Sequence, residues 1–176
     1  MPRPAWAEDV PVPASVQVPI LLKVLTFDRN FDDRVKSQLK IGIVYAEEDP
    51  ESRQAKDNIV KILTGYADKT IKQLPITYVL IRYTTEQNVV ESAKSEGVNV
   101  LYVTPGNAKH LAALLRVSQK LRIITVTGVP EYVEQGVTVG LGLKSDKKTE
   151  ILINLKSSKI EGAAFDANLL RLATVM

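Results

Sequence analysis

The sequence predicts one α/β domain: a mostly parallel open sheet with helices on both faces, plus an antiparallel hairpin near the C-terminus. Short apolar runs alternate with segments of helical periodicity over residues 40–127, and two strictly alternating segments follow Gly136. Such alternation of strands and helices is typical of βαβ units, whose right-handed crossovers place helices on both faces of the sheet. The 176 residues suffice for one domain with a full-sized core.

The helical segments share apolar residues spaced three and four apart, and they are predicted over residues 19–34, 49–66, 86–96 and 107–121. Pro19 suits the first turn of the first helix, where its missing N–H is not needed. Asp49 and Asn107 are expected as N-caps, and Gly97 is expected to close the third helix. Two short helical stretches are expected from about Ser157 and around Leu169.

The strand segments are continuous apolar runs of the kind buried on both faces, predicted over residues 40–46, 76–83, 98–103 and 122–127. Residues 137–143 and 151–155 instead alternate apolar with other residues. The polar segment KSDKKT between them is typical of a hairpin loop. We therefore expect these last two strands to be antiparallel, at one edge of the sheet.

Composition excludes several classes of function. The 23 basic and 20 acidic side chains leave a net charge of +3, and the charges are scattered, so no nucleic-acid partner is expected. The chain has no cysteine, which excludes disulfides, thiolate nucleophiles and zinc–cysteine sites. No apolar run has the roughly 18–20 residues that are needed to span a bilayer.

No motif predicts a catalytic, cofactor or metal site, so the protein is not expected to be an enzyme. His110, the one histidine, lies near a helix start without a motif partner, which favours a structural role. Residues 140–142 (GLG) lie inside a strand rather than at the strand-to-helix turn that dinucleotide binding requires. Residues 125–128 (TVTG) follow the fourth strand, whereas a flavodoxin phosphate loop follows the first. The acids at 47–49 are explained by helix capping, so no metal ion is expected.

The residues that follow the parallel strands form the candidate ligand site. In an open parallel sheet, ligands bind beyond the carboxyl ends of the strands. Hydroxyl groups and helix-start N–H groups at these ends predict a small polar or anionic ligand there, with the site residues Tyr45, Thr84, Thr104, Gly106, Asn107, Thr125, Thr127 and Gly128. Turn formation and helix capping explain the same residue types, so both interpretations stay open.

Residues 1–13 are rich in proline and lack periodicity, so they are predicted to be disordered, which leaves residues 14–176 as the domain. Ala5-Trp6-Ala7 before Glu8 resembles the small-x-small pattern that signal peptidase cuts, although the preceding apolar segment is missing. The segment is therefore interpreted as a signal-peptide remnant of an exported, periplasmic protein. An ordinary ragged N-terminus is the alternative.

Several segments together resemble the YfiR-like family of bacterial exported proteins: LLKVLTFDRN (21–30), KIGIVYA (40–46), DPES (49–52), VNVLYVTPG (98–106) and RIITVTG (122–128). The ending at 151–175 is the most specific, with a strand that carries Asn154, a short helix, a glycine, and then Leu169 and Leu170. The resemblance covers nearly the whole chain from about Val16. Its motifs are packing patterns, so no functional residue is carried over from the family.

The resemblance implies a periplasmic regulatory or sensory protein that acts by binding. The member that names the family looks like a repressor of a membrane diguanylate cyclase, whose periplasmic domain it binds, and other members look like ligand-sensing domains. The expected partner is therefore a membrane signalling protein, either a diguanylate cyclase or a sensor kinase, modulated by a small polar ligand. A homodimer stays open. Relatives can carry pairing cysteines, which this chain lacks, so redox gating by its own disulfides is excluded.

Two other functions remain as alternatives. Solute-binding components of transport systems have half-domains with a similar α/β pattern, although they normally have two lobes. A small flavodoxin-like carrier or enzyme is the third interpretation, and the lack of a nucleophile motif counts against it.

Overall fold

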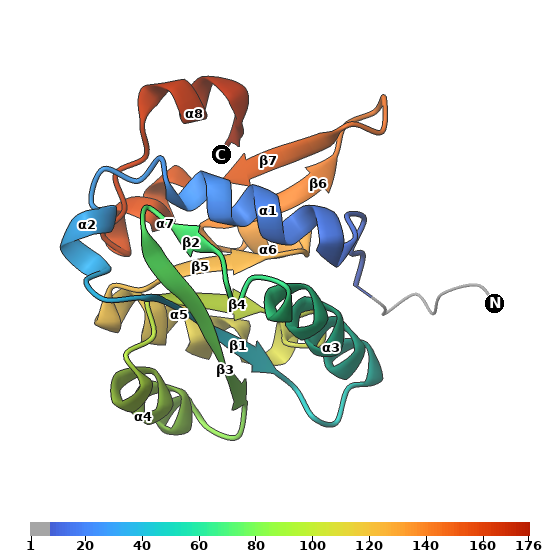
Figure 1. The fold of residues 1–176 in the computed structure, drawn as a ribbon. Helices are drawn as coiled ribbons and strands as arrows, with labels where there is room; N and C mark the ends of the chain where they lie inside the picture. The colour runs from blue at the N-terminus through green and yellow to red at the C-terminus, as the bar shows by residue number, and fades with distance from the viewer. Residues whose placement is uncertain (1–7) are drawn as a thin grey trace.

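The computed structural model describes residues 8–176, which form an open sheet covered by helices (Figure 1). The eight strands lie in the order β2-β3-β1-β4-β5-β6-β7-β8. Their bounds are Leu39–Tyr45 (β1), Thr70–Ile71 (β2), Leu74–Arg82 (β3), Val100–Val103 (β4), Ile124–Thr127 (β5), Val139–Leu143 (β6), Thr149–Ile153 (β7) and Thr174–Val175 (β8). Strands β3, β1, β4, β5 and β6 are parallel, whereas β7 is antiparallel to β6. The predicted fold class, including the hairpin, is confirmed.

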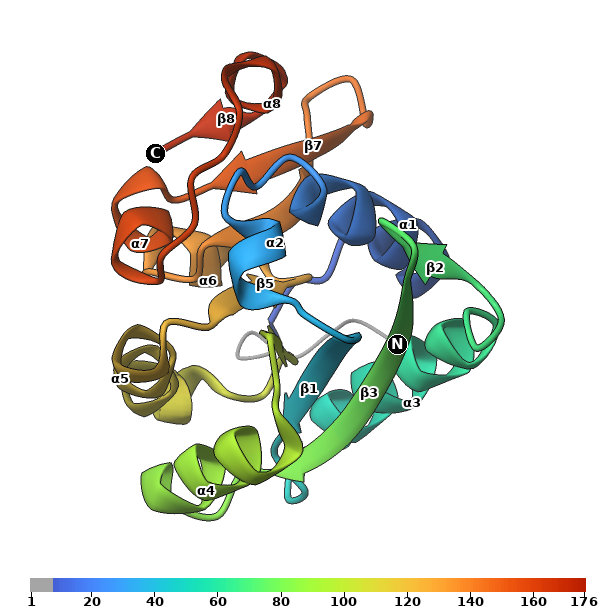
Figure 2. The ribbon, with the colours of Figure 1, turned by 60° about the vertical axis from the view of Figure 1, so that its left-hand side comes forward.

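Four longer helices cover the sheet, two on each face. Helices α1 (Ala14–Leu25) and α3 (Pro50–Thr64) lie on one side, and α4 (Glu86–Glu96) and α5 (Leu111–Leu121) on the other (Figure 2). The core divides accordingly: Ile43 of β1 packs with the first pair of helices and the adjacent Val44 with the second. Shorter helical turns complete the chain at Phe31–Arg34 (α2), Ala108–His110 (η1), Pro130–Glu134 (α6), Leu155–Ile160 (α7) and Ala167–Leu172 (α8).

Two of the predicted helix boundaries are confirmed by their capping contacts. The Asp49 carboxylate accepts a hydrogen bond of 2.9 Å from the Ser52 N–H and begins α3. Gly97 ends α4 with a φ of 66°, a left-handed conformation that glycine adopts without a steric cost.

The first helix differs from its prediction. Residues 19–34 were expected as one helix, but α1 begins at Ala14 and ends at Leu25, so Pro19 lies inside it rather than in the first turn. The chain then turns because the Asp28 carboxylate is buried and accepts hydrogen bonds from the N–H groups of Asn30 (3.0 Å) and Ala164 (2.9 Å). These contacts join the turn to the C-terminal segment instead of continuing the helix.

Three short elements of the structure are not predicted by the sequence. Strands β2 and β8 contain two residues each, and α6 contains five, so none is long enough to show a periodicity. The turn between β2 and β3 has positive φ at Lys72 (48°) and Gln73 (69°), which is the geometry that closes tight hairpins. Glycine and asparagine are the residues that predict such a turn, and neither occurs at these two positions.

Residues 8–13, part of the segment predicted to be disordered, contact the domain. Val12 is buried, and its carbonyl accepts a 2.7 Å hydrogen bond from Nε2 of Gln17 in α1. Burial of an apolar side chain and a paired carbonyl explain how this part packs on the domain. The Ala5-Trp6-Ala7 pattern lies outside the described residues. Within residues 8–176, no helix is both long and apolar enough to cross a membrane.

Candidate functional site

The sheet order creates a crevice at the carboxyl ends of β1 and β4. These strands are neighbours, but the chain leaves β1 into α3 on one face and leaves β4 into α5 on the other face. The loops after the two strands therefore diverge. This arrangement is a topological switch point, the place where open α/β sheets bind ligands.

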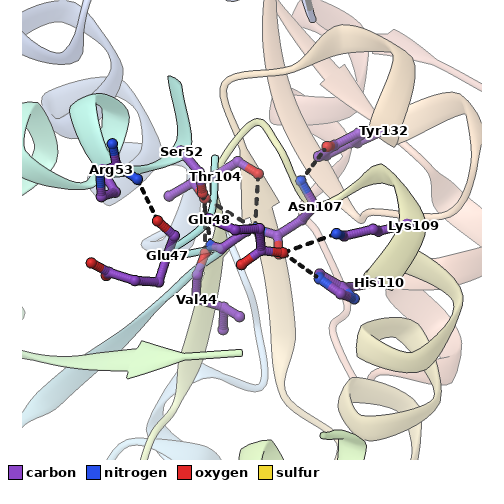
Figure 3. A network of polar contacts seen from close by, with 11 residues as sticks. Val44, Glu47, Glu48, Ser52, Arg53, Thr104, Asn107, Lys109, His110 and Tyr132 are labelled. Carbon is purple, nitrogen blue, oxygen red and sulfur yellow. Dashed lines mark hydrogen bonds and ion pairs between the residues drawn. The ribbon is translucent and has the colours of Figure 1, made fainter. Parts of the chain in front are cut away.

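Three buried polar side chains join the two loops at this point (Figure 3). The Ser52 hydroxyl oxygen accepts from the Ala46 N–H at 2.8 Å and lies 2.7 Å from the Thr104 hydroxyl. Nδ2 of Asn107 donates to Thr104 Oγ1 at 3.0 Å and to the Val44 carbonyl at 3.2 Å. The network fixes the loop after β4 against β1 and the start of α3.

Asn107 was expected to cap a helix, and the structure gives it another role. It precedes η1, but its side chain makes no capping hydrogen bond. Its Nδ2 is directed to Thr104 and Val44 instead, because those buried acceptors lie within reach. Its Oδ1 is buried and has no hydrogen-bond partner among the described residues. A buried acceptor without a donor is unusual in a folded protein and marks a place where a ligand or a water can bind.

Gly106 gives the loop after β4 its shape. Its φ is 83°, and a Cβ atom added there would lie 2.7 Å from Cγ of Asp49, so the loop requires glycine. The Gly106 N–H donates to Oε2 of Glu8 at 2.5 Å, and the Tyr132 hydroxyl donates to the same oxygen at 2.6 Å. The Tyr132 oxygen also accepts from the Asn107 N–H at 3.0 Å. A residue of the N-terminal segment therefore binds in the crevice.

Two open hollows flank this loop. One of about 370 Å³ is lined by Glu8, Glu48, Asp49, Pro50, Gly106, Ala108 and Lys109. The other, of about 310 Å³, lies between the N-terminal segment, α1, α3 and the end of β4, and Val10, Val12, Tyr102 and Pro105 are among its lining residues. Charged and apolar groups line the first hollow, and amide and apolar side chains predominate in the second, so the crevice offers both polar and apolar contacts to a small molecule.

The charged rim is organised around Glu48 (Figure 3). Its Oε1 lies 3.0 Å from Lys109 Nζ and 3.5 Å from His110 Nε2. A hydrogen bond from its own backbone N–H, followed by the contact with Lys109, lowers the pKa of Glu48 to about 2. The His110 ring stacks on Tyr83 with the ring centroids 3.8 Å apart. Burial, followed by the hydrogen bond to Glu8, raises the pKa of Tyr132, so this hydroxyl remains protonated and able to donate.

Of the residues predicted from the sequence, Thr104, Gly106 and Asn107 lie together in the crevice. Tyr45 lies at the adjacent strand end, but Lys56 of α3 covers its ring, with Nζ 4.6 Å from the ring centroid. Thr127 is buried, and its hydroxyl donates to the Val103 carbonyl at 2.8 Å, so it links β5 to β4.

The other three predicted residues lie elsewhere. Thr84 is exposed in the loop after β3. The Thr125 hydroxyl is buried and donates to Oε1 of Glu161 at 2.7 Å, which places it in a separate cluster. Gly128 is covered by Gln17, because an added Cβ would lie 2.6 Å from the Gln17 Nε2 atom.

Sequence reasoning missed Glu8, Ser52 and Tyr132. Ser52 is the third residue after the Asp49 cap, a position that patterns of helix capping do not connect with a neighbouring strand. Tyr132 belongs to the short helix α6, which was not predicted, and Glu8 belongs to the segment predicted to be disordered. No local pattern links either of them to Gly106.

Solved structures with a similar fold come from several bacteria. A conserved domain protein from Vibrio cholerae has a TM-score of 0.65 at 14% identity, with 93% of this chain and 60% of that chain covered. The ABC domain in complex with L-Trp from Streptococcus pneumoniae has a TM-score of 0.64 at 13% identity, with 93% and 60% covered. A substrate-binding protein with adhesive properties from Clostridium difficile, in a ligand-free open structure, has a TM-score of 0.59 at 18% identity, with 84% and 57% covered.

These similarities show the α/β fold, and the chain spans about three fifths of the length of each of these structures. A search of curated proteins by sequence found no significant match. A family model described as YfiR/HmsC-like matches residues 15–174, nearly the whole of the described domain. The chain therefore belongs to the YfiR/HmsC-like family.

Proposed function

We propose that this protein is a periplasmic regulator that docks on a membrane signalling protein, either a diguanylate cyclase or a sensor kinase. The observation that carries the proposal is the family match over residues 15–174. Docking would change the activity of the partner by favouring one of its conformations.

The modulator in this proposal is a small polar ligand in the crevice between β1 and β4. Gly106 and Tyr132 present donors there, and the unpaired Oδ1 of Asn107 is an acceptor. A ligand alters docking only as far as it binds the docked and free states with different affinity. The proposed ligand residues are therefore Thr104, Gly106 and Asn107, together with Tyr132.

The hydroxyls of Thr104 and Thr127, two of the residues predicted from the sequence, are structural rather than nucleophilic in this proposal. Thr104 donates to the Val44 carbonyl at 3.0 Å and Thr127 to the Val103 carbonyl at 2.8 Å. Both hydroxyls thus hold neighbouring strands together. A nucleophile would instead need a base within hydrogen-bond distance of its hydroxyl.

The docking face in this proposal is the C-terminal edge of the sheet. Strand β8 is the last strand at that edge, and it follows α8 directly (Figure 2). Leu172 is 73% exposed, and Val175 and Met176 next to it are each 42% exposed. Neighbouring apolar side chains that remain exposed are typical of interaction surfaces. The opposite edge offers a matched control, because Leu80 of β3 is also exposed, at 43%.

The test measures binding of the purified protein to the periplasmic domains of the signalling proteins encoded beside its gene, by isothermal titration calorimetry. We expect one of them to bind, and Leu172→Glu to weaken that binding at least about tenfold. Leu80→Glu should leave it unchanged. Absence of binding to any such domain would refute the proposal, and equal weakening by the two variants would refute the docking face.

A solute-binding component of a transport system is the second candidate. It is favoured by the similar fold of the L-Trp complex and of the substrate-binding protein described above. A thermal-shift screen with small metabolites, L-tryptophan included, tests it, since a ligand at 100 times its Kd adds about 2.7 kcal/mol of stability. A ligand together with a permease encoded beside the gene favours transport. A ligand together with a signalling partner favours regulation.

A further inference from the structure

The Glu8 carboxylate binds to two donors that the rest of the fold holds in place. Its Oε2 accepts from the Gly106 N–H at 2.5 Å and from the Tyr132 hydroxyl at 2.6 Å. Glu8 is 98 residues from Gly106 and 124 residues from Tyr132 in the sequence, so this contact is not a local turn.

The position of each donor depends on contacts that do not involve Glu8. The loop at Gly106 packs closely against Asp49 and Ser52, and its neighbour Asn107 is bonded to Thr104. Tyr132 is 1% exposed, and its hydroxyl oxygen accepts from the Asn107 N–H. Removal of the Glu8 side chain would therefore leave two preorganised donors directed at one point. Such a pair can bind another oxyanion without reorganisation.

Charge does not explain why a carboxylate binds here. Asp49 and Glu48 line the same hollow as Glu8, and Lys109 is the one basic residue among its lining residues. Lys109 is already paired with Glu48 at 3.0 Å. Like charges repel, so the acidic residues that line the hollow disfavour the Glu8 carboxylate, and the two hydrogen bonds favour it. The unpaired Asn107 Oδ1 is an acceptor, so it would need a donor group of a bound molecule other than the carboxylate.

We propose that the Gly106 N–H and the Tyr132 hydroxyl form a carboxylate-binding subsite, which Glu8 fills in the free protein and which a small organic carboxylate takes by displacing Glu8. This inference rests on the ligand crevice of the proposed function and names the chemistry of the ligand. Glu8 then competes with the ligand for this subsite from within the same chain.

Competition of this kind has a characteristic signature. A ligand that can bind only when Glu8 has left shows an affinity reduced by the fraction of molecules in which the subsite is open. If Glu8 fills the subsite in about nine molecules of ten, its removal tightens ligand binding about tenfold. If the Glu8 contact had a purely structural role, its removal would instead weaken ligand binding, because its loss would loosen the loop at Gly106.

The experiment follows the Gly106 amide resonance of the full chain by ¹⁵N NMR, with acetate, succinate and glycine as the probes. Wild type, Glu8→Ala and the double variant Glu8→Ala/Tyr132→Phe are compared. Asp9→Ala, which removes the adjacent carboxylate of the same segment, is the control. In Glu8→Ala the resonance should move, and a probe should return it toward its wild-type position. The probe should bind Glu8→Ala about tenfold more tightly than it binds wild type.

The double variant should lose the response, and Asp9→Ala should behave as wild type. Equal binding to wild type and Glu8→Ala, or no response of Glu8→Ala to any probe, would overturn the subsite. Docking on a signalling domain without a carboxylate response overturns the subsite alone. Carboxylate binding without docking on any signalling domain overturns the proposed function and leaves the subsite in place.

Discussion

The buried polar cluster around Glu161 and the one in the crevice at Glu8 differ in how completely their atoms are paired. Both Glu161 oxygens are paired: Oε1 accepts from the hydroxyls of Ser118 (2.8 Å) and Thr125 (2.7 Å). Oε2 accepts from the Thr125 N–H (2.9 Å) and the Thr138 hydroxyl (2.5 Å). The cluster joins α5, β5 and the chain before β6 to the end of α7.

The crevice cluster is paired less completely. Asn107 Oδ1 has no partner in the described part of the chain, and the two donors at Gly106 and Tyr132 are paired through a residue from the N-terminal segment. This contrast indicates that buried polar clusters can serve two different purposes in a protein. A cluster closed entirely by the domain fixes its structure, and a cluster closed by a segment outside the sheet can exchange that partner for another.

The largest expected effect is the loss of stability in Glu161→Ala. This substitution removes the acceptor of the buried Thr125 and Thr138 donors, and it creates a cavity. The Ser118 hydroxyl keeps the Leu115 carbonyl as an acceptor at 3.0 Å. We expect the free energy of unfolding to fall by about 3–5 kcal/mol, measured by urea denaturation. Glu134→Ala, at an exposed position, should change it by less than about 0.5 kcal/mol. A loss below about 1 kcal/mol in Glu161→Ala would contradict a structural role for this cluster.

Gly106→Ala should have the next largest effect. An alanine at a φ of 83° is strained, and its Cβ would lie 2.7 Å from Cγ of Asp49. We expect a loss of about 1–3 kcal/mol, measured by the same denaturation experiment. Gly65→Ala is the matched control, because Gly65 has a φ of −70°, which alanine adopts without strain, and an added Cβ would lie 3.3 Å from the Ile62 carbonyl oxygen. Equal stability of the two variants would show that the loop adapts and that its donors are not preorganised.

Tyr132→Phe should have a smaller effect on stability, about 1–2 kcal/mol, because the Asn107 N–H loses its acceptor while the ring stays buried. Tyr102→Phe is the comparison, since its hydroxyl is also buried and donates to Gln17 Oε1 at 2.5 Å. Thermal unfolding of both variants measures the losses. A loss of stability in Tyr132→Phe as large as that in Glu161→Ala would contradict the difference proposed between the two clusters.

The smallest expected effect concerns pH and the exposed rim. The folded-state pKa of Glu48 is about 2, below the value of about 4.3 expected for an unfolded chain. Its stabilising contribution is therefore present above about pH 4.3 and is lost as the pH falls toward 2. Because the side chain is half exposed, Glu48→Gln should cost no more than about 0.5 kcal/mol at pH 7. Thermal unfolding at pH 7 and pH 3 should show this difference shrinking in acid, and a difference that grows would contradict the assignment.

The sequence predicts the crevice better than it predicts the contacts inside it. Runs of apolar residues define β1, β4 and β5, and the rule for parallel sheets then points to Thr104, Gly106 and Asn107. Thr125 was included because it belongs to the same short run as Thr127. It lies two residues, about 7 Å, back from the end of β5, where it contacts Glu161 instead.

One physical reason explains why the sequence does not reveal Glu8, Ser52 and Tyr132 as site residues. Hydrophobic periodicity reports which face of an element is buried, and capping patterns report contacts within a few residues. The Glu8 contacts span 98 and 124 residues, and the Ser52–Thr104 contact spans 52 residues. Such pairs arise only when the sheet order brings separate loops together, so no single segment of the sequence records them.

Glu8 also lies outside residues 15–174, the range that matches the family. The donors that it pairs with, at Gly106 and Tyr132, lie inside that range. In evolutionary terms, the receptor and its built-in competitor belong to parts of the gene that can diverge independently. A change of one codon ahead of the range that matches the family would therefore reset the ligand concentration to which such a protein responds, while the domain itself and its docking surface remain as they are.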